Sequence, residues 1–298
     1  MTSLGEDPPA LTMRAHAKLN VFLRVLGRRA DGFHDLESLM LPLELHDLLS
    51  VRRAADLRLD VSGPASAGVP RDRANLVLAA ARALLDAGSV DGAGAEIALE
   101  KRIPVAAGLG GGSADAAATL QALNTLWGCG LGPTELGEIG AEVGSDVPAL
   151  LANEPVFVTG RGEHVTPVHV PITWWVLRPF AFEVRTQDAF AWWDADPATG
   201  PDAGVLTAAA ETGNDELLGS ALFNDLQAPV TARHPQILEA IEAFQRAGAL
   251  GAVMTGSGPT VVALASHLSH ADRLAESVPG STVTSGPPAP VHPAPAAG

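Results

Sequence analysis

The stretch PVAAGLGGGSADAAA, residues 104–118, decides the fold of this chain. Its four glycines are Gly108, Gly110, Gly111 and Gly112. Without Cβ atoms the loop can adopt positive φ angles and point several N–H groups into one concavity. An alanine-rich segment follows and predicts a helix running to about Trp127. Because unpaired amides and the helix dipole both favour negative charge, the stretch predicts a site for a nucleotide phosphate.

Three other glycine-rich motifs do not fit this loop. A Walker loop ends in Gly-Lys-Ser/Thr, but Gly112 is followed by Ser113 and Ala114. A dinucleotide fingerprint starting at Gly108 requires a glycine where Ser113 stands. A protein-kinase loop is accompanied by V-A-I-K and H-R-D motifs, which this sequence lacks. A flexible hinge or a plain strand–helix turn remains the alternative, but neither requires so long a run of small residues before a helix.

Composition restricts the class of protein. The 298 residues, 47% hydrophobic and 18% charged, can bury a large core and predict two subdomains. The single cysteine, Cys129, excludes an internal disulfide and a multi-cysteine metal site, and the nine histidines show no metal-binding spacing, so we assign no metal ligand. With no signal-peptide pattern and no long apolar run, we expect a cytoplasmic protein that does not enter a membrane.

The chain is strongly acidic. Its formal net charge of −15 would repel a polyanion, so we expect no nucleic-acid partner. A small phosphorylated ligand remains possible, because loop amides and a few local cations can hold it.

The hydrophobic patterns predict an α+β fold of two domains, since strands and helices mix without a regular βαβ repeat. Strands are predicted at 15–26, 48–61, 96–103, 156–159 and 174–177 and on both sides of a turn within 252–264, and helices at 75–87, 206–211 and 235–247. We expect an N-terminal domain over residues 12–154 and a C-terminal domain over 155–285. Flexible tails are predicted at 1–11 and 286–298.

Two charged residues far apart in the sequence are candidates for chemistry. Lys18 and Asn20 lie two positions apart on a predicted strand and therefore point to one side. A solvated surface lysine is the alternative, but the strand is otherwise apolar. Asp146, between Gly144 and Pro148, stands where a carboxylate caps a helix. The same position can aim it at a cleft, where phosphoryl transfer needs a group to accept the proton of a hydroxyl.

Three separated segments resemble the GHMP kinase superfamily of ATP-dependent small-molecule kinases. They are AKLN at 17–20, PVAAGLGGGSADAA at 104–117 and VMTGSGPT at 253–260. Alone, Gly256-Ser257-Gly258 is either a hairpin turn or a second loop close to a ligand. Within the superfamily, AKLNVFLRVLGRRADGFH at 17–34 and GSDVP at 144–148 are similar to 4-diphosphocytidyl-2-C-methyl-D-erythritol kinases. The resemblance implies the two-domain GHMP kinase fold, with the active site in the cleft between domains.

The resemblance also implies a reaction, ATP-dependent phosphorylation of the 2-hydroxyl of the methylerythritol moiety in non-mevalonate isoprenoid biosynthesis. Asp146 takes the catalytic aspartate position and would accept the hydroxyl proton. Lys18 takes the catalytic lysine position, where it would favour the deprotonated aspartate or hydroxyl and offset charge on the transferred phosphoryl group. Mg²⁺ is expected to accompany ATP, with no protein ligand assigned.

Two sets of binding residues follow from the resemblance. The ATP set comprises Pro104, Val105, Ala106, Ala107, Gly108, Leu109, Gly110, Gly111, Gly112, Ser113 and Ala114, with Asn75 and Lys101 near the adenine. The acceptor set comprises Asn20, Phe33, His34, Thr186, Phe190, Gly256 and Ser257. Phe33, where the family often has tyrosine, would stack on cytosine, and His34 would meet its polar edge. The segment after Pro179 is slightly longer than the family pattern.

Two other interpretations remain. Another GHMP kinase, acting on homoserine, mevalonate or a sugar, would make RADGFH at 29–34 a coincidence. A non-catalytic nucleotide-binding protein would need neither Lys18 nor Asp146. For either enzyme we expect a small-molecule substrate and a monomer or weak homodimer.

Overall fold

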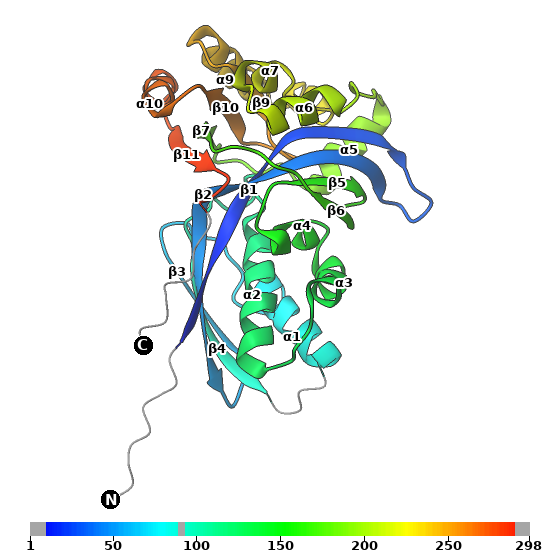
Figure 1. Cartoon of the computed structure of the whole chain (residues 1–298), viewed down its shortest axis with the longest axis vertical. Coiled ribbons are helices and arrows are strands. Elements are labelled where there is room, and N and C mark those ends of the chain that lie inside the picture. Colours follow the sequence, from blue (N-terminus) through cyan, green and yellow to red (C-terminus); the bar gives the residue numbers. More distant parts are fainter. Residues whose placement is uncertain (1–9, 89–92, 290–298) are drawn as a thin grey trace, which may run out of the picture.

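The computed structural model describes residues 10–88 and 93–289 (Figure 1), and these form a seven-stranded and a four-stranded sheet. The first sheet contains β1 (Leu11–Arg28), β2 (His34–Ala54), β3 (Arg58–Ser62), β4 (Gly94–Glu100), β5 (Val156–Gly160), β6 (His164–Pro167) and β8 (Phe223–Asn224). The second contains β7 (Thr173–Arg178), β9 (Gly251–Met254), β10 (Val261–Ala265) and β11 (Thr282–Gly286).

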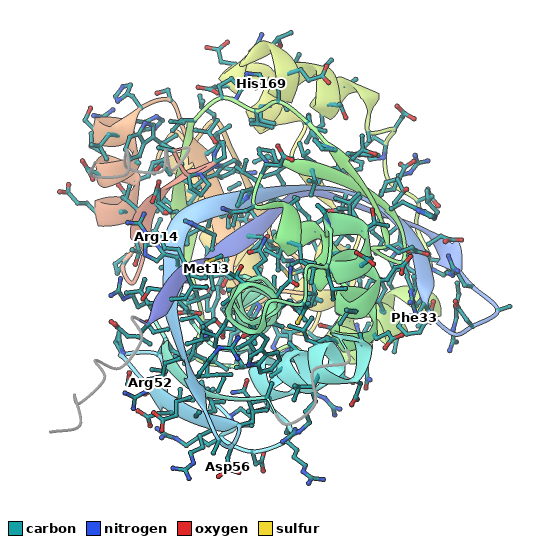
Figure 2. All side chains as sticks on the ribbon, turned by 60° about the horizontal axis from the view of Figure 1, so that its bottom comes forward. Met13, Arg14, Phe33, Arg52, Asp56 and His169 are labelled. Carbon is teal, nitrogen blue, oxygen red and sulfur yellow. The ribbon has the colours of Figure 1, made fainter. Side chains whose placement is uncertain are left out.

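A long antiparallel hairpin of β1 and β2 forms the spine of the first sheet, whose strand order is β3-β4-β2-β1-β8. The β3–β4 and β1–β8 pairs are parallel. β5 pairs with β2 and with β6, forming a second branch of the sheet. Figure 2 shows Phe33 at the tip of the hairpin, far from Arg52 and Asp56 at the other end of β2. The hairpin therefore reaches across the molecule.

Helices cover the two sheets separately (Figure 1). Beside the first sheet are α1 (Leu76–Gly88), α2 (Gly111–Trp127), α3 (Pro133–Val143) and α4 (Val147–Ala152). Around the second are α5 (Thr186–Ala195), α6 (Gly204–Thr212), α7 (Asp215–Ser220), α8 (Gln227–Thr231), α9 (Pro235–Arg246) and α10 (Leu268–Ser277). The buried face of α2 packs with α1, β2 and β4 in one core, and α9 and α10 pack with β7 and β10 in another. Between them, a third core joins β1 and β2 to the second sheet, so the hairpin belongs to both halves.

One strand and the inner ends of the two tails differ from the pattern-based expectation. The predicted strand 48–61 is the end of β2 followed by β3, because β2 already begins at His34. The sheets do not separate near residue 155, since β5, β6 and β8 all join the first sheet. Division of the sequence at 154/155 therefore stays a proposal. Leu11 and Gly286 lie in strands, while residues 1–9 and 290–298 of the expected tails lie outside the described residues.

In residues 10–88 and 93–289, every helix is too short or too polar to cross a membrane.

Candidate active site

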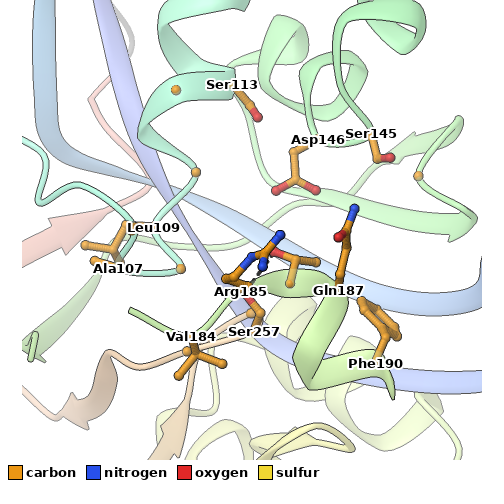
Figure 3. A pocket seen from close by; sticks show the side chains of 18 of the residues that line it. Ala107, Leu109, Ser113, Ser145, Asp146, Val184, Arg185, Gln187, Phe190 and Ser257 are labelled. Carbon is orange, nitrogen blue, oxygen red and sulfur yellow. Dashed lines mark hydrogen bonds between the residues drawn. The ribbon is translucent and has the colours of Figure 1, made fainter. Parts of the chain in front are cut away.

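A cavity of about 900 Å³ lies where the glycine loop, β1, the start of α4 and the start of α5 meet (Figure 3). Its lining draws on residues before and after position 155. All predicted site residues line it except Ala114, which is buried in the core and donates its N–H to Gly110. The fold therefore brings together segments that are widely separated in the sequence.

The glycine loop is held against β1 by its backbone. Ala106, Gly108 and Gly110 have φ angles of 53°, 77° and 69°, a left-handed region that favours glycine. The N–H of Lys18 donates to the carbonyl of Leu109 at 3.0 Å. α2 begins after Gly110 without a side-chain cap, so its first-turn amides have no partner within the helix. This arrangement can hold an anion, as the sequence predicts.

The second glycine segment lies directly on the first. Gly256-Ser257-Gly258 connects the antiparallel strands β9 and β10 and also lines the cavity, so the two interpretations of this segment are compatible. A Cβ atom on Gly108 would lie 2.7 Å from the carbonyl oxygen of Thr255 and 2.8 Å from that of Gly258. Such a close approach requires glycine at position 108.

Lys18 is buried beside the cavity, with 5% of the residue exposed. Its Nζ donates to Oδ1 of Asn20 and lies 3.3 Å from Oδ2 of Asp146. Asn20 in turn donates its Nδ2 to the hydroxyl of Ser38 at 2.7 Å. Lys18 is therefore not a solvated surface lysine, and the period-2 prediction that it shares a side with Asn20 is confirmed.

Asp146 occupies the N-cap position of α4 but makes no side-chain capping hydrogen bond. Its carboxylate faces Lys18, and its side chain is 33% exposed. Figure 3 shows the Asp146 side chain pointing into the cavity. The backbone position that favours a helix cap thus serves to aim the carboxylate at the cavity.

Lys101 has a different environment. Its Nζ donates to Asp47 and, at 2.7 Å, to Asp115, and all three residues are buried. Asp47 also accepts the backbone N–H groups of Arg102 and Ile103, whereas Oδ1 of Asp115 has no partner in the described part of the chain. Burial raises the pKa of Asp115 to about 8, Lys101 opposes this shift, and Asp47 adds to it. Because one ammonium cannot neutralise two carboxylates, the cluster favours the protonated form of Asp115.

Asn75 lines the same end of the cavity as Lys101. Its Oδ1 accepts the N–H of Val77 at 2.9 Å, and its Nδ2 donates to the carbonyl of Pro70 at 2.7 Å. Asn75 therefore fixes the start of α1, and its amide side chain is already engaged.

The opposite end of the cavity is aromatic. His34 stacks on Phe190 with ring centroids 4.6 Å apart, and its Nε2 lies 2.8 Å from Oδ1 of Asp194. Phe33 is 47% exposed, with the guanidinium of Arg161 5.1 Å from its ring centroid. Thr186, one helical turn before Phe190, lies 3.2 Å from Ser257 between their hydroxyl oxygens. Of the predicted acceptor residues, Phe33, His34 and Phe190 therefore lie at this end, where the imidazole covers one face of Phe190. Asn20 and Gly256 lie instead beside Lys18.

Sequence reasoning missed Asp47, Asp115, Asp194 and Arg185, which pair with or stand beside the predicted residues. Asp47 is 54 residues from Lys101, and Asp194 is 160 residues from His34, so no local pattern links them. Asp115 had a usable signal, because it is the one charge in an alanine-rich segment predicted to be helical.

In residues 10–88 and 93–289, no group of three or more His, Cys, Asp or Glu side chains could hold a metal ion.

Comparison with known proteins agrees with this geometry. Models of the GHMP kinases N terminal domain and the GHMP kinases C terminal match residues 75–154 and 206–282. A crystal structure of a 4-(cytidine 5'-diphospho)-2C-methyl-D-erythritol kinase superposes with a TM-score of 0.78 at 32% identity, covering 93% of this chain and 100% of that one. A homoserine kinase from Cytophaga hutchinsonii, 21% identical with a TM-score of 0.72 over 96% of both chains, shares the fold. Fold and site together define a GHMP-type small-molecule kinase.

Two curated relatives narrow the family. The 4-diphosphocytidyl-2-C-methyl-D-erythritol kinase of Symbiobacterium thermophilum is 42% identical over 90% of this chain and 95% of its own length. The enzyme of the same name from Kineococcus radiotolerans is 42% identical over 90% and 86%. The chain belongs to this family of kinases, and the predicted fold class and family are confirmed. It is an ATP-dependent phosphotransferase with an alcohol group as acceptor.

Proposed function

We propose that this enzyme uses ATP to phosphorylate the 2-hydroxyl of 4-diphosphocytidyl-2-C-methyl-D-erythritol, a step of non-mevalonate isoprenoid biosynthesis. The observation that carries the proposal is the Lys18–Asp146 contact of 3.3 Å, in a cavity with a glycine loop at one end and an aromatic cluster at the other. ATP at the glycine loop and an acceptor whose nucleobase lies at the aromatic cluster would thus meet at the Lys18–Asp146 pair. The names of the relatives supply the identity of that acceptor.

Asp146 is proposed to accept the proton of the attacking hydroxyl. Its carboxylate is partly exposed, makes no capping hydrogen bond and can therefore turn toward a bound alcohol. Lys18 is proposed to stabilise the negative charge that develops on the hydroxyl oxygen and on the transferred group. Asn20 holds the ammonium of Lys18 in place, because its Oδ1 accepts from Nζ while its Nδ2 is tied to Ser38.

The phosphates of ATP are proposed to lie on the glycine loop, where the first-turn amides of α2 supply donors. Mg²⁺ usually keeps several waters and is held by substrate phosphates with one or two carboxylates, so it needs no cage of three protein ligands. Mg²⁺ would enter as the complex with ATP, where it neutralises phosphate charge. The adenine would lie toward Asn75 and Lys101, which line the far end of the cavity.

The cytosine is proposed to bind among Phe33, His34 and Phe190. Phe33 presents an exposed ring that a base can stack on. His34 already stacks on one face of the Phe190 ring, so cytosine could stack only on the other face of that ring.

The test is ADP release from purified protein with ATP-Mg²⁺ and a panel of alcohols. We expect turnover of the cytidylyl compound and loss of about 10²- to 10⁴-fold in kcat for Asp146→Asn, with ATP binding retained. Asp196→Asn is the matched control, because Asp196 is exposed and does not line the cavity. Turnover of homoserine, mevalonate or a sugar, without turnover of the cytidylyl compound, would refute the proposed acceptor. ATP binding without turnover of any alcohol would contradict the catalytic assignment.

A further inference from the structure

One cation in the cavity is unused by the proposed mechanism. Among the described residues, five lysine and arginine side chains line the cavity, and four of them already face a carboxylate or an aromatic ring: Lys18, Arg28, Lys101 and Arg161. The fifth, Arg185, is exposed, and its guanidinium makes no ion pair, hydrogen bond or ring contact within residues 10–88 and 93–289. Figure 3 shows it pointing into the cavity on the side where Asp146 lies. Its charge is therefore available to a ligand.

Arg185 stands between the two functional ends of the acceptor site. It is the residue directly before α5, whose first residue Thr186 contacts Ser257 of the second glycine segment. Phe190 and Asp194 lie one and two turns further along the same helix, at the aromatic end. A ligand with its base near Phe190 and its reacting hydroxyl near Asp146 would pass its linking group along the start of α5.

The charge balance of the cavity makes this cation important. Five acidic residues line the cavity beside the five basic ones: Asp31, Asp115, Asp146, Glu183 and Asp194. Because burial favours the protonated form of Asp115, the lining has at most a small surplus of positive charge, and the chain as a whole has a formal net charge of −15. An anionic group bound away from the amides of the glycine loop is therefore favoured by an unpaired cation, since neither the lining nor the overall field supplies much attraction.

We propose that Arg185 binds the diphosphate of the acceptor, a nucleoside diphosphate derivative; this assignment rests on the proposed function. A planar guanidinium with several N–H donors matches phosphate oxygens and forms paired, charge-assisted hydrogen bonds. The phosphates of ATP have a separate set of donors in the glycine loop and α2. Arg185 belongs instead to the helix that carries Phe190, so it serves the acceptor.

Binding of two probes tests the assignment, because cytidine lacks the diphosphate that CDP carries. For Arg185→Ala we expect calorimetry to show CDP binding weakened about 10- to 100-fold, with cytidine binding changed less than about twofold. Arg185→Lys should recover part of the CDP affinity, since it restores the charge without the planar fork. The matched control is Arg246→Ala, which removes an exposed arginine of α9 that pairs with Glu242 outside the cavity.

Several outcomes would overturn the assignment. Equal weakening of CDP and cytidine would mean that Arg185 acts only through local structure. An increase confined to the KM for ATP would assign the guanidinium to the donor. Turnover of the cytidylyl compound with an unchanged ratio of CDP to cytidine affinity would refute the role of Arg185 while the proposed function stands. Wild-type protein that turns over only another alcohol would refute both.

Discussion

Two buried lysines lie beside the glycine loop, and their surroundings could hardly differ more. Lys18 faces one carboxylate, that of Asp146, which is 33% exposed and lines the cavity. Lys101 faces two carboxylates, Asp47 and Asp115, whose side chains are 0% and 4% exposed, although Asp115 stands in the wall of the cavity. Lysine and aspartate therefore form a partly exposed pair at Lys18 and a buried ion cluster at Lys101. What separates them is whether the carboxylate can still reach a ligand.

The largest effect is expected from Lys101→Met. Removing the ammonium leaves two carboxyl groups buried without their cation, which should lower the free energy of unfolding by about 3–5 kcal/mol. Urea denaturation measures this change. A loss below about 1 kcal/mol would show that the cluster is not a structural element of this kind.

Lys18→Met should act on the reaction rather than on the fold. We expect kcat to fall about 10²- to 10³-fold, since the ammonium no longer offsets developing charge. Asp146 is partly exposed, so water can replace its partner, and the unfolding free energy should change by less than about 1 kcal/mol. Steady-state kinetics and denaturation on the same preparation separate the two effects. A stability loss as large as that of Lys101→Met would erase the distinction between the two lysines.

The third test concerns pH. The pKa of Asp115, about 8 in the folded protein, lies above the ordinary value of 3.8, so the folded state holds a proton that the unfolded state releases. Stability from this group should therefore be fully present below about pH 4 and fall as pH rises to about 8, by at most about 1.4 kcal/mol per pH unit. Asp115→Asn, which resembles the protonated form, should flatten this dependence. Parallel stability curves for wild type and variant from pH 5 to 9 would contradict the assignment.

The smallest effects should come from the two glycines beside these lysines. A Cβ on Gly110 would lie 2.8 Å from Cγ of Lys18, and the φ of 69° adds backbone strain of about 1–2 kcal/mol. Gly110→Ala should therefore displace Lys18 and lower kcat about tenfold.

Gly111 lies within α2, and its Cβ would meet Ile103 at 3.1 Å and Lys101 at 3.3 Å. Gly111→Ala should leave stability within about 1 kcal/mol of wild type, as unfolding curves will show, because the helical backbone favours alanine. An equal loss of kcat in Gly110→Ala and Gly111→Ala would contradict the idea that Gly110→Ala acts by displacing Lys18.

Much of the working site could be predicted, because its signals are local. The glycine loop and its helix follow from residue type, and the shared side of Lys18 and Asn20 follows from strand periodicity. Asp146 could be placed on a helix start, yet its contact with Lys18 came only from the family resemblance. The buried ion cluster could not be predicted, since Asp47 and Lys101 meet only after β2 pairs with β4. The full length of β2 was hidden for a related reason: residues 38–43 are buried on both sides, so they do not alternate.

A contact between β1 and the turn after β9 bears on how the enzyme is made. Asn20, which accepts a hydrogen bond from Lys18, donates its backbone N–H to the hydroxyl of Thr255, 235 residues later in the chain. During synthesis the ribosome releases β1 long before Thr255, so the active-site strand must wait for almost the whole polypeptide before this contact forms. Such distant pairings slow folding and expose intermediates to aggregation. A nascent chain would therefore carry its glycine loop and Lys18 before the second glycine segment, which completes the cavity, has been made.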